Sequence, residues 1–131
     1  MNGAAREANR TMILSLRPSF ASLIYSGSKA FEFRRVRMAA TVGDRVLIYE
    51  SAPVGRVTGE FVVGDIVYGP PGEILKMAGS RAGAGAAGYL QGCDCATALL
   101  VTCAVEWSEP RDLRELGLAR APQSYQFLGQ P

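Results

Sequence analysis

The sequence predicts one α+β domain, built on a small and mostly antiparallel β-barrel with short helices at its flank. Two features support this prediction. Many apolar segments have the length of a short strand, and the longest β-branched one is interrupted by Gly59 and Gly64, as strands are where a barrel bends. With 131 residues, 48% of them hydrophobic, the chain has the usual size of a domain whose core needs no metal or disulfide.

The chain begins with a polar segment, residues 1–10, that we expect to be a disordered tail before a single domain over residues 11–131. An apolar run of strand length, residues 12–16, ends at an Arg-Pro step, because proline cannot continue a central strand ladder. Pro18 suits the first turn of a helix in which apolar residues recur at i, i+3 and i+4, and Gly27 marks its end. A strand followed directly by a short helix is therefore expected.

The segment KAFEFRRV, residues 29–36, alternates between apolar and charged side chains. Phe31 and Phe33 point to one side of the predicted strand, and Glu32 and Arg34 point to the other. This alternation is typical of a half-buried strand. The phenylalanines are predicted to face the core.

The middle of the chain reads as two more strands and a helix. A turn at residues 42–44 leads into a buried strand over residues 45–50. A long strand over residues 55–69 follows and is expected to bend at a bulge, because two glycines interrupt it. Two prolines then break the sheet pattern, and residues 72–79 favour a helix.

The last third of the chain combines a weak helical segment with a strand and a closing segment. Residues 80–92 stand where a surface helix would fit, but three glycines each cost about 1 kcal/mol there relative to alanine, so a poorly held helix or a mobile loop is expected. Residues 96–107 predict a long apolar strand, residues 109–116 a short amphipathic helix, and residues 121–128 the closing segment.

Charge is distributed unevenly along the chain. Residues 1–60 carry nine Lys/Arg against five Asp/Glu, net +4, and residues 61–131 carry five against seven, net −2. The first half therefore suits an anionic partner such as a nucleic acid. The N-terminal segment lacks the apolar core of a signal peptide, and no apolar run approaches the roughly 20 residues of a membrane span. A cytoplasmic protein without membrane contact is expected.

The inventory of reactive side chains excludes several kinds of site. The chain contains no histidine, so Ser-His-Asp and Cys-His mechanisms are excluded, and any catalysis must rest on Lys, Glu/Asp, Tyr, Ser or Arg. Its three cysteines, Cys93, Cys95 and Cys103, suit neither a disulfide framework nor a closed zinc site within one chain. Reduced thiols, no metal and no cofactor are expected.

Four residues form a recognisable pattern directly after the first predicted helix. Gly27, Lys29, Glu32 and Arg34 read G-x-K-x-x-E-x-R, and this run resembles the signature of the ASCH domain, a relative of the PUA-like β-barrels. The likeness is to the small stand-alone bacterial and archaeal type and spans roughly residues 12–128. The flanking segments that share it are ILSLRPSFASLIYSG, VGDRVLIYESAPVGRVTGEF, YLQG and APQSYQFL.

The resemblance implies a PUA-like barrel whose cleft carries the signature residues. Members of the PUA-like group bind RNA or modified bases, and ASCH domains are linked to transcription regulation or RNA processing. Some small ASCH proteins are enzymes, either ribonucleases or amidohydrolases acting on acylated cytidine. In the amidohydrolase branch the signature ends in Thr, the nucleophile that Lys activates. This chain keeps Lys29 but has Glu32 at that position, and residues 75–90 contain no carboxylate to supply the later Glu.

Each signature side chain has a functional and a purely structural interpretation. Lys29 can contact a phosphate or a base carbonyl, or act as a general base, but it can equally be a solvated lysine at a helix end. Glu32 and Arg34 can bind an exocyclic amine and a phosphate or carbonyl, or can form a structural ion pair. Strict alternation would place Lys29 opposite Glu32, so the two converge only if Lys29 lies in the turn before the strand.

Five further residues are secondary candidates for the same cleft. They share a polar or aromatic side chain beside the signature segment, in the predicted fold or by the family resemblance: Arg17, Tyr49, Ser51, Ser124 and Tyr125. Tyr49 can stack on a base or pack in the core, and the closing segment can read a base edge or cap the barrel.

We therefore predict that the chain binds RNA or a modified nucleotide or nucleoside through Lys29, Glu32 and Arg34. The alternative is a hydrolase on the same scaffold, a ribonuclease or an acylated-cytidine amidohydrolase, with Lys29 as base and Glu32 as acid or water-positioning group. A second alternative is a protein-interaction module, for which residues 80–92 are the candidate surface.

Overall fold

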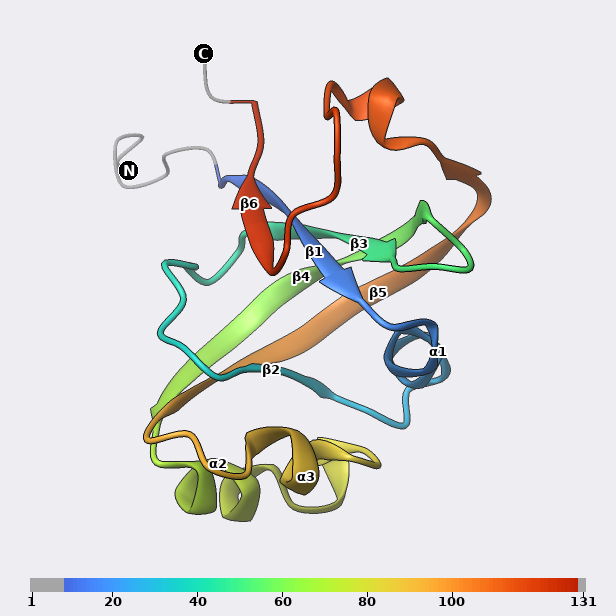
Figure 1. Cartoon of the computed structure of the whole chain (residues 1–131). Helices are drawn as coiled ribbons and strands as arrows, with labels where there is room; N and C mark the ends of the chain where they lie inside the picture. Colours follow the sequence, from blue (N-terminus) through green and yellow to red (C-terminus); the bar gives the residue numbers. More distant parts are fainter. Residues whose placement is uncertain (1–8, 130–131) are drawn as a thin grey trace.

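A computed structural model describes residues 9–129, which form a single curled six-stranded sheet with short helices around it (Figure 1). The strands follow the order β2-β5-β4-β3-β1-β6 across the sheet. The elements are β1 Thr11–Leu16, α1 Pro18–Ser26, β2 Phe31–Arg34, β3 Arg45–Glu50, β4 Arg56–Gly69, α2 Pro71–Ala78, η2 Gly79–Ala82, α3 Ala86–Leu90, β5 Ala96–Arg111, η3 Leu113–Leu116 and β6 Tyr125–Phe127.

The predicted α+β class is confirmed, and the sheet is a half-barrel. Strand β1 pairs in parallel with β3, and the other neighbouring strands are antiparallel. Strands β2 and β6 are the two edges of the sheet, so no ladder of backbone hydrogen bonds closes the barrel between them. Helix α1 lies beside the sheet, and α2 and α3 lie together at one end of it (Figure 1).

The curl of the sheet comes from its two longest strands. The ladder between β4 and β5 shifts register three times, where the strands bulge, and bulges increase the local twist. Two glycines allow the close approach of the chains: a Cβ at Gly59 would lie 2.2 Å from the carbonyl oxygen of Val105, and one at Gly64 would lie 2.4 Å from Thr102 Cγ2. The bend that the sequence predicted in this segment is confirmed.

The two faces of the sheet pack against different partners. Met12 and Leu14 of β1 belong to the cluster inside the curl, and Ile13 between them packs on the outer face, as the alternation of a strand requires.

Phe31 and Phe33 of β2 are buried in the core, as predicted, and pack against α2 and α3. The expectation of a half-buried strand is wrong, because Glu32 and Arg34 on the other side are buried too.

The segment at residues 80–92 differs from the prediction. Instead of one poorly held helix, it forms η2 and α3, and Ala82, Ala86 and Leu90 are buried against the two phenylalanines. Gly83 and Gly85 lie in the connection between the two short helices. Both have φ +86°, a left-handed conformation that glycine adopts without strain. The glycines that weaken a continuous helix are therefore the residues that allow this turn.

The prediction for residues 109–116 is wrong in its first part. Strand β5 continues to Arg111, and only Leu113–Leu116 is helical, as a 3₁₀ turn. Asp112 explains where the helix begins, because its side chain and that of Glu115 form a capping box. The chain therefore leaves the sheet four residues later than the apolar pattern indicated.

Most of the predicted N-terminal tail, residues 1–8, lies outside the described residues. Arg10 at its end contacts the domain: its guanidinium lies 3.3 Å from an oxygen of Asp44 and 4.0 Å from the centre of the Phe127 ring. Among the helices of residues 9–129, none is long and apolar enough to cross a membrane.

Candidate functional site

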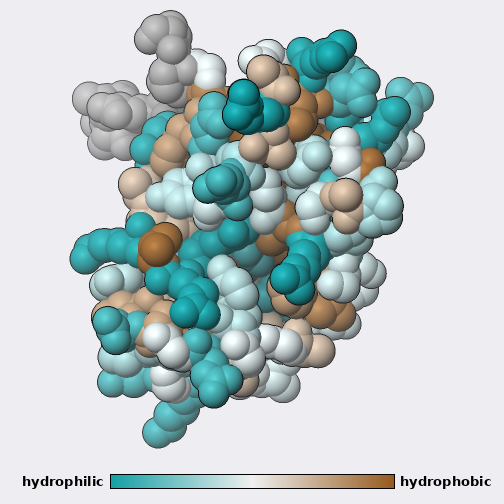
Figure 2. Space-filling view, viewed as in Figure 1, coloured by the Kyte–Doolittle hydropathy of each residue, from teal (hydrophilic) through white to brown (hydrophobic). Residues whose placement is uncertain are grey.

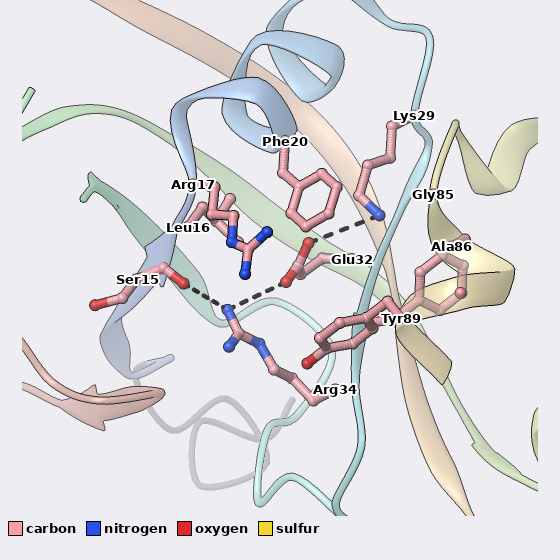
Figure 3. Close-up of a pocket in the computed structure, with 12 residues that line it drawn as sticks. Ser15, Leu16, Arg17, Phe20, Lys29, Glu32, Arg34, Gly85, Ala86 and Tyr89 are labelled. Atoms are coloured by element: carbon pink, nitrogen blue, oxygen red, sulfur yellow. Dashed lines mark hydrogen bonds and ion pairs between the residues drawn. The ribbon is translucent and has the colours of Figure 1, made fainter. Parts of the chain in front are cut away.

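A cavity of about 420 Å³ lies between α1, β2 and α3, at the open side of the half-barrel (Figure 3). This volume is in the range of small-molecule sites, roughly 300 to 1,000 Å³. We call it the basic pocket. Its lining residues are Ser15, Leu16, Arg17, Phe20, Lys29, Glu32, Phe33, Arg34, Gly85, Ala86, Gly88 and Tyr89.

Lys29 enters the pocket from the turn between α1 and β2. Gly27 ends α1 with a left-handed φ of +85°, and the Lys29 amide donates a 3.1 Å hydrogen bond back to the carbonyl of Leu23. Lys29 therefore precedes β2, which begins at Phe31. Its Nζ lies 3.9 Å from Glu32 Oε1, so the turn brings the two side chains to one cavity.

The Lys29 ammonium is enclosed by aromatic rings. The residue is 5% exposed, and its Nζ lies 4.5 Å from the centre of the Phe33 ring and 5.6 Å from that of Phe20. Ring faces attract cations, but burial removes water from the ammonium. Burial lowers the pKa of Lys29 below its ordinary value, the Glu32 charge opposes this change, and the Arg34 charge adds to it.

Arg34 connects the two edges of the half-barrel. Its Nη2 lies 3.2 Å from Glu32 Oε2 and donates a 2.9 Å hydrogen bond to the carbonyl of Ser15 in β1. Its Nη1 donates a 3.4 Å bond to Ser124 Oγ, next to β6. One guanidinium thus bridges β2 and the opposite edge, where no backbone ladder exists. Its Nε is buried and has no hydrogen-bond partner in the described structure.

Glu32 lies between the two cations and is 4% exposed. Burial raises the pKa of this carboxyl, and Arg34, Lys29 and the Phe33 amide lower it, in decreasing order. One carboxylate against two cations leaves a net charge of +1 in the pocket. Arg17 on its wall adds another positive charge. The pocket therefore favours an anionic group that brings hydrogen-bond acceptors.

Of the secondary candidates, some lie at the basic pocket and others lie elsewhere in the fold. Arg17 lines the pocket, and Ser124 reaches it through Arg34. The hydroxyl of Tyr125 accepts a 3.4 Å hydrogen bond from the Ala39 amide, and its ring packs against the cluster inside the curl.

Tyr49 and Ser51 lie away from the pocket wall. Tyr49 packs against Ile13 and Val57 on the outer face of the sheet, because alternation in β3 turns its neighbour inward. Ser51 follows β3, and its amide donates a 2.9 Å hydrogen bond to the carbonyl of Leu16. Trp107 also packs in the outer cluster.

Three aromatic residues of the pocket were absent from the sequence-based candidates, and one of them, Phe33, was expected to face only the core. Phe20 has the spacing of a core residue on α1, and that spacing concealed its place on the pocket wall. Tyr89 lies on α3, in the glycine-rich segment expected to be poorly held. The position of Gly83 shows why the segment packs here, because a Cβ at this residue would lie 3.0 Å from Lys29 Cβ and Cγ.

A second cavity of about 340 Å³ lies on the other side of α1. We call it the acidic pocket; it is lined by Ser22, Tyr25, Ser26, Glu50 and Glu106. Thr58 Oγ1 donates a 2.7 Å hydrogen bond to Glu50 Oε2, so the Tyr25 hydroxyl, 2.8 Å away, donates to Thr58. Within residues 9–129 no group of three or more His, Cys, Asp or Glu side chains is arranged to hold a metal ion.

Known proteins match this chain in sequence and in structure. The family model of the ASCH domain matches residues 14–102. The crystal structure of ASCH from Zymomonas mobilis superposes with a TM-score of 0.81 at 30% sequence identity, covering 92% of this chain and 89% of that one. A single-substitution variant of the same protein gives a TM-score of 0.81 at 29% identity, with 93% and 92% of the two chains covered.

Another protein with a similar sequence is a ribosomal protein. The large ribosomal subunit protein uL22 of Ureaplasma parvum serovar 3 is 26% identical in an alignment 126 residues long that covers 93% of this chain. The match covers 40% of the length of that protein. The chain therefore spans less than half of this relative.

Proposed function

The chain belongs to the ASCH domain family, and from this premise we propose that its basic pocket binds one nucleotide unit of RNA, or a modified nucleotide, through Lys29, Glu32 and Arg34. The observation that carries the proposal is the buried group of two cations and one carboxylate, whose excess positive charge faces an open cavity. ASCH domains have a PUA-like fold that generally binds RNA, and this agrees with the proposal.

Each signature side chain has a chemical role in this proposal. The guanidinium of Arg34 and the ammonium of Lys29 donate to phosphate or base carbonyl oxygens. Glu32 accepts from an exocyclic amine or a sugar hydroxyl. Phe20 and Tyr89 offer ring faces on which a base can stack.

Two lysines make a direct test possible. Lys29 and Lys76 are the only lysines of the chain, and Lys76 is exposed on α2. Calorimetric titration with the four ribonucleoside 5′-monophosphates should show binding that Lys29→Ala weakens at least tenfold and Lys76→Ala leaves unchanged. For short RNA strands, the logarithm of the binding constant should fall by about 0.7 per phosphate contact for each tenfold rise in salt concentration.

The result that contradicts this proposal is equally direct. If neither mononucleotides nor short RNA strands bind to the folded protein, or if both lysine variants weaken binding equally, the pocket does not hold a nucleotide. Circular dichroism of each variant checks that the fold is retained.

A hydrolase on the same site is a second candidate, and one observation favours it. An amine whose pKa is lowered lies 3.9 Å from a carboxyl whose pKa is raised, which is the arrangement of a base and an acid. In this proposal Lys29 takes a proton from water or a ribose hydroxyl, and Glu32 gives one to the leaving group. Turnover of RNA or of acylated cytidine that Lys29→Ala and Glu32→Gln abolish would support it; binding without turnover would refute it.

A protein-interaction role on residues 80–92 has less support. The exposed large hydrophobic residues of the described chain, Val36, Val42, Val54, Tyr68, Met77 and Val105, lie outside that segment. On the face seen in Figure 2, hydrophobic residues form only small separate groups among hydrophilic ones.

A further inference from the structure

We propose that a second nucleotide subsite lies beside the basic pocket, where the ring of Tyr68, with Arg37 against it, stacks with the next base of a single-stranded RNA. This inference rests on the proposed function, because it extends the strand whose first nucleotide occupies the pocket. It assigns a role to two residues outside the family signature. Its ligand is a single strand of RNA at least two nucleotides long.

Tyr68 is exposed in a way that the other aromatic residues are not. It is 43% exposed near the end of β4, and it is the only aromatic among the exposed large hydrophobic side chains of residues 9–129. The guanidinium carbon of Arg37 lies 4.8 Å from the centre of its ring. An exposed aromatic ring with a guanidinium against it combines the two elements that bind unpaired bases and their backbone.

The register of the sheet places Tyr68 near the pocket. Thr97 of β5 pairs with Arg34 of β2 on one side and with Tyr68 of β4 on the other. Residues directly opposite in neighbouring strands point to the same face of a sheet. Arg34 and Tyr68 therefore share a face at a distance of two strand spacings, about 10 Å between backbones.

The segment after β2 is held over this row by hydrogen bonds. Thr97 Oγ1 donates a 2.7 Å bond to the carbonyl of Val36 and accepts a 3.1 Å bond from the amide of Met38. The backbone on both sides of Arg37 is thus tied to the strand that pairs with Tyr68. This attachment holds the Arg37 side chain beside the ring.

Arg35 lies at the edge of the pocket. Its Nη1 donates hydrogen bonds of 3.0 and 3.2 Å to the carbonyls of Tyr89 and Gln91, and Tyr89 also lines the pocket. Within residues 9–129 neither Arg35 nor Arg37 has a carboxylate within ion-pair distance. Arg35 beside the pocket and Arg37 beside the Tyr68 ring are therefore uncompensated positive charges, which attract a phosphate backbone.

The test compares a short strand with a single nucleotide. Uridine 5′-monophosphate and a tetrauridylate RNA are titrated into the wild-type protein, Tyr68→Leu, Tyr68→Phe and Arg37→Gln. The tetramer should bind wild type more tightly than the monomer. Tyr68→Leu should lose about 5- to 150-fold in tetramer affinity, the equivalent of one stacked base, and nothing in monomer affinity. Tyr68→Phe should keep the tetramer affinity, because it retains the ring.

A matched control separates this local effect from loss of positive charge. Arg111→Gln removes an exposed arginine that is paired with Glu115, in a different part of the protein. Arg37→Gln should weaken tetramer binding and Arg111→Gln should not. Equal effects of the two changes would overturn the subsite.

Other outcomes are also decisive. If monomer and tetramer bind wild type equally, or if Tyr68→Leu weakens both by the same factor, the subsite is refuted and the proposed function of the pocket stands. If the tetramer binds but Lys29→Ala has no effect on it, the pocket proposal fails instead. If neither ligand binds, both proposals fail.

Discussion

The two cavities beside α1 are built from opposite charges. In the basic pocket, Lys29 and Arg34 surround the buried carboxylate of Glu32. In the acidic pocket, Glu50 and Glu106 lie beside neutral hydroxyl groups. Glu50 Oε2 accepts a hydrogen bond from Thr58 rather than from a cation. A single helix of nine residues separates an anion-attracting wall from a cation-attracting one.

This difference follows from how each carboxylate is compensated. Glu32 depends on charges, which attract strongly after burial but leave a large cost if one of them is removed. Glu50 depends on a chain of hydrogen bonds from Tyr25 through Thr58, each of which contributes less. A buried carboxylate held by cations can therefore organise a ligand site, whereas one held by hydroxyl groups mainly orders its neighbours.

The largest expected effect is the loss of the central carboxylate. Glu32→Gln leaves two buried cations without their counter-charge and should lower the free energy of unfolding by about 3 to 5 kcal/mol. Glu50→Gln, the matched change in the acidic pocket, should cost about 0.5 to 1.5 kcal/mol. Urea unfolding of both variants measures the two values. Equal losses would remove the distinction between ionic and hydroxyl compensation.

The next effect concerns the wall that covers Lys29. Gly83→Ala introduces a Cβ 3.0 Å from the lysine side chain at a residue with φ +86°, and should destabilise the protein by about 1 to 3 kcal/mol. Gly88→Ala in the same segment has open space around its Cβ, and should stabilise α3 by about 0.5 to 1 kcal/mol. Thermal unfolding distinguishes the two; a neutral Gly83→Ala would mean that the wall does not hold Lys29 in place.

The smallest effect belongs to the acidic pocket. Burial, together with the nearby Glu50 and Glu106 charges, raises the pKa of Tyr25 to about 12. Because the raised pKa belongs to the folded state, the stability it contributes is present below pH 10 and is lost as the pH rises toward 12. Tyr25→Phe should cost about 0.5 to 1.5 kcal/mol at neutral pH.

Ultraviolet absorbance measures the same tyrosine directly. The folded wild type should keep one tyrosine protonated to about pH 12, and this component should be missing from Tyr25→Phe. An unchanged alkaline titration in the variant would show that Tyr25 is not the buried hydroxyl at the acidic pocket.

The local features of this protein follow from patterns within short stretches of its sequence. The spacing of its apolar residues predicted β1, α1, β3 and β4 nearly at their observed ends, because period and proline or glycine breaks are local properties. Alternation predicted that Phe31 and Phe33 are buried, and the signature identified Lys29, Glu32 and Arg34, which the structure brings to one cavity. Lys29 converges with Glu32 because it lies in the turn before β2, as strict strand alternation requires.

The surroundings of these residues depend on how distant parts of the chain pack together. Phe20 and Tyr89 come from helices whose spacing carries no information about which cavity they line, and Tyr49 lies on the outer face because the register of β3 sets its direction. The link from Arg34 to Ser15 and Ser124 joins residues 19 and 90 positions apart. Contacts over such separations depend on how the whole sheet curls, and a local pattern in the chain does not contain that curvature.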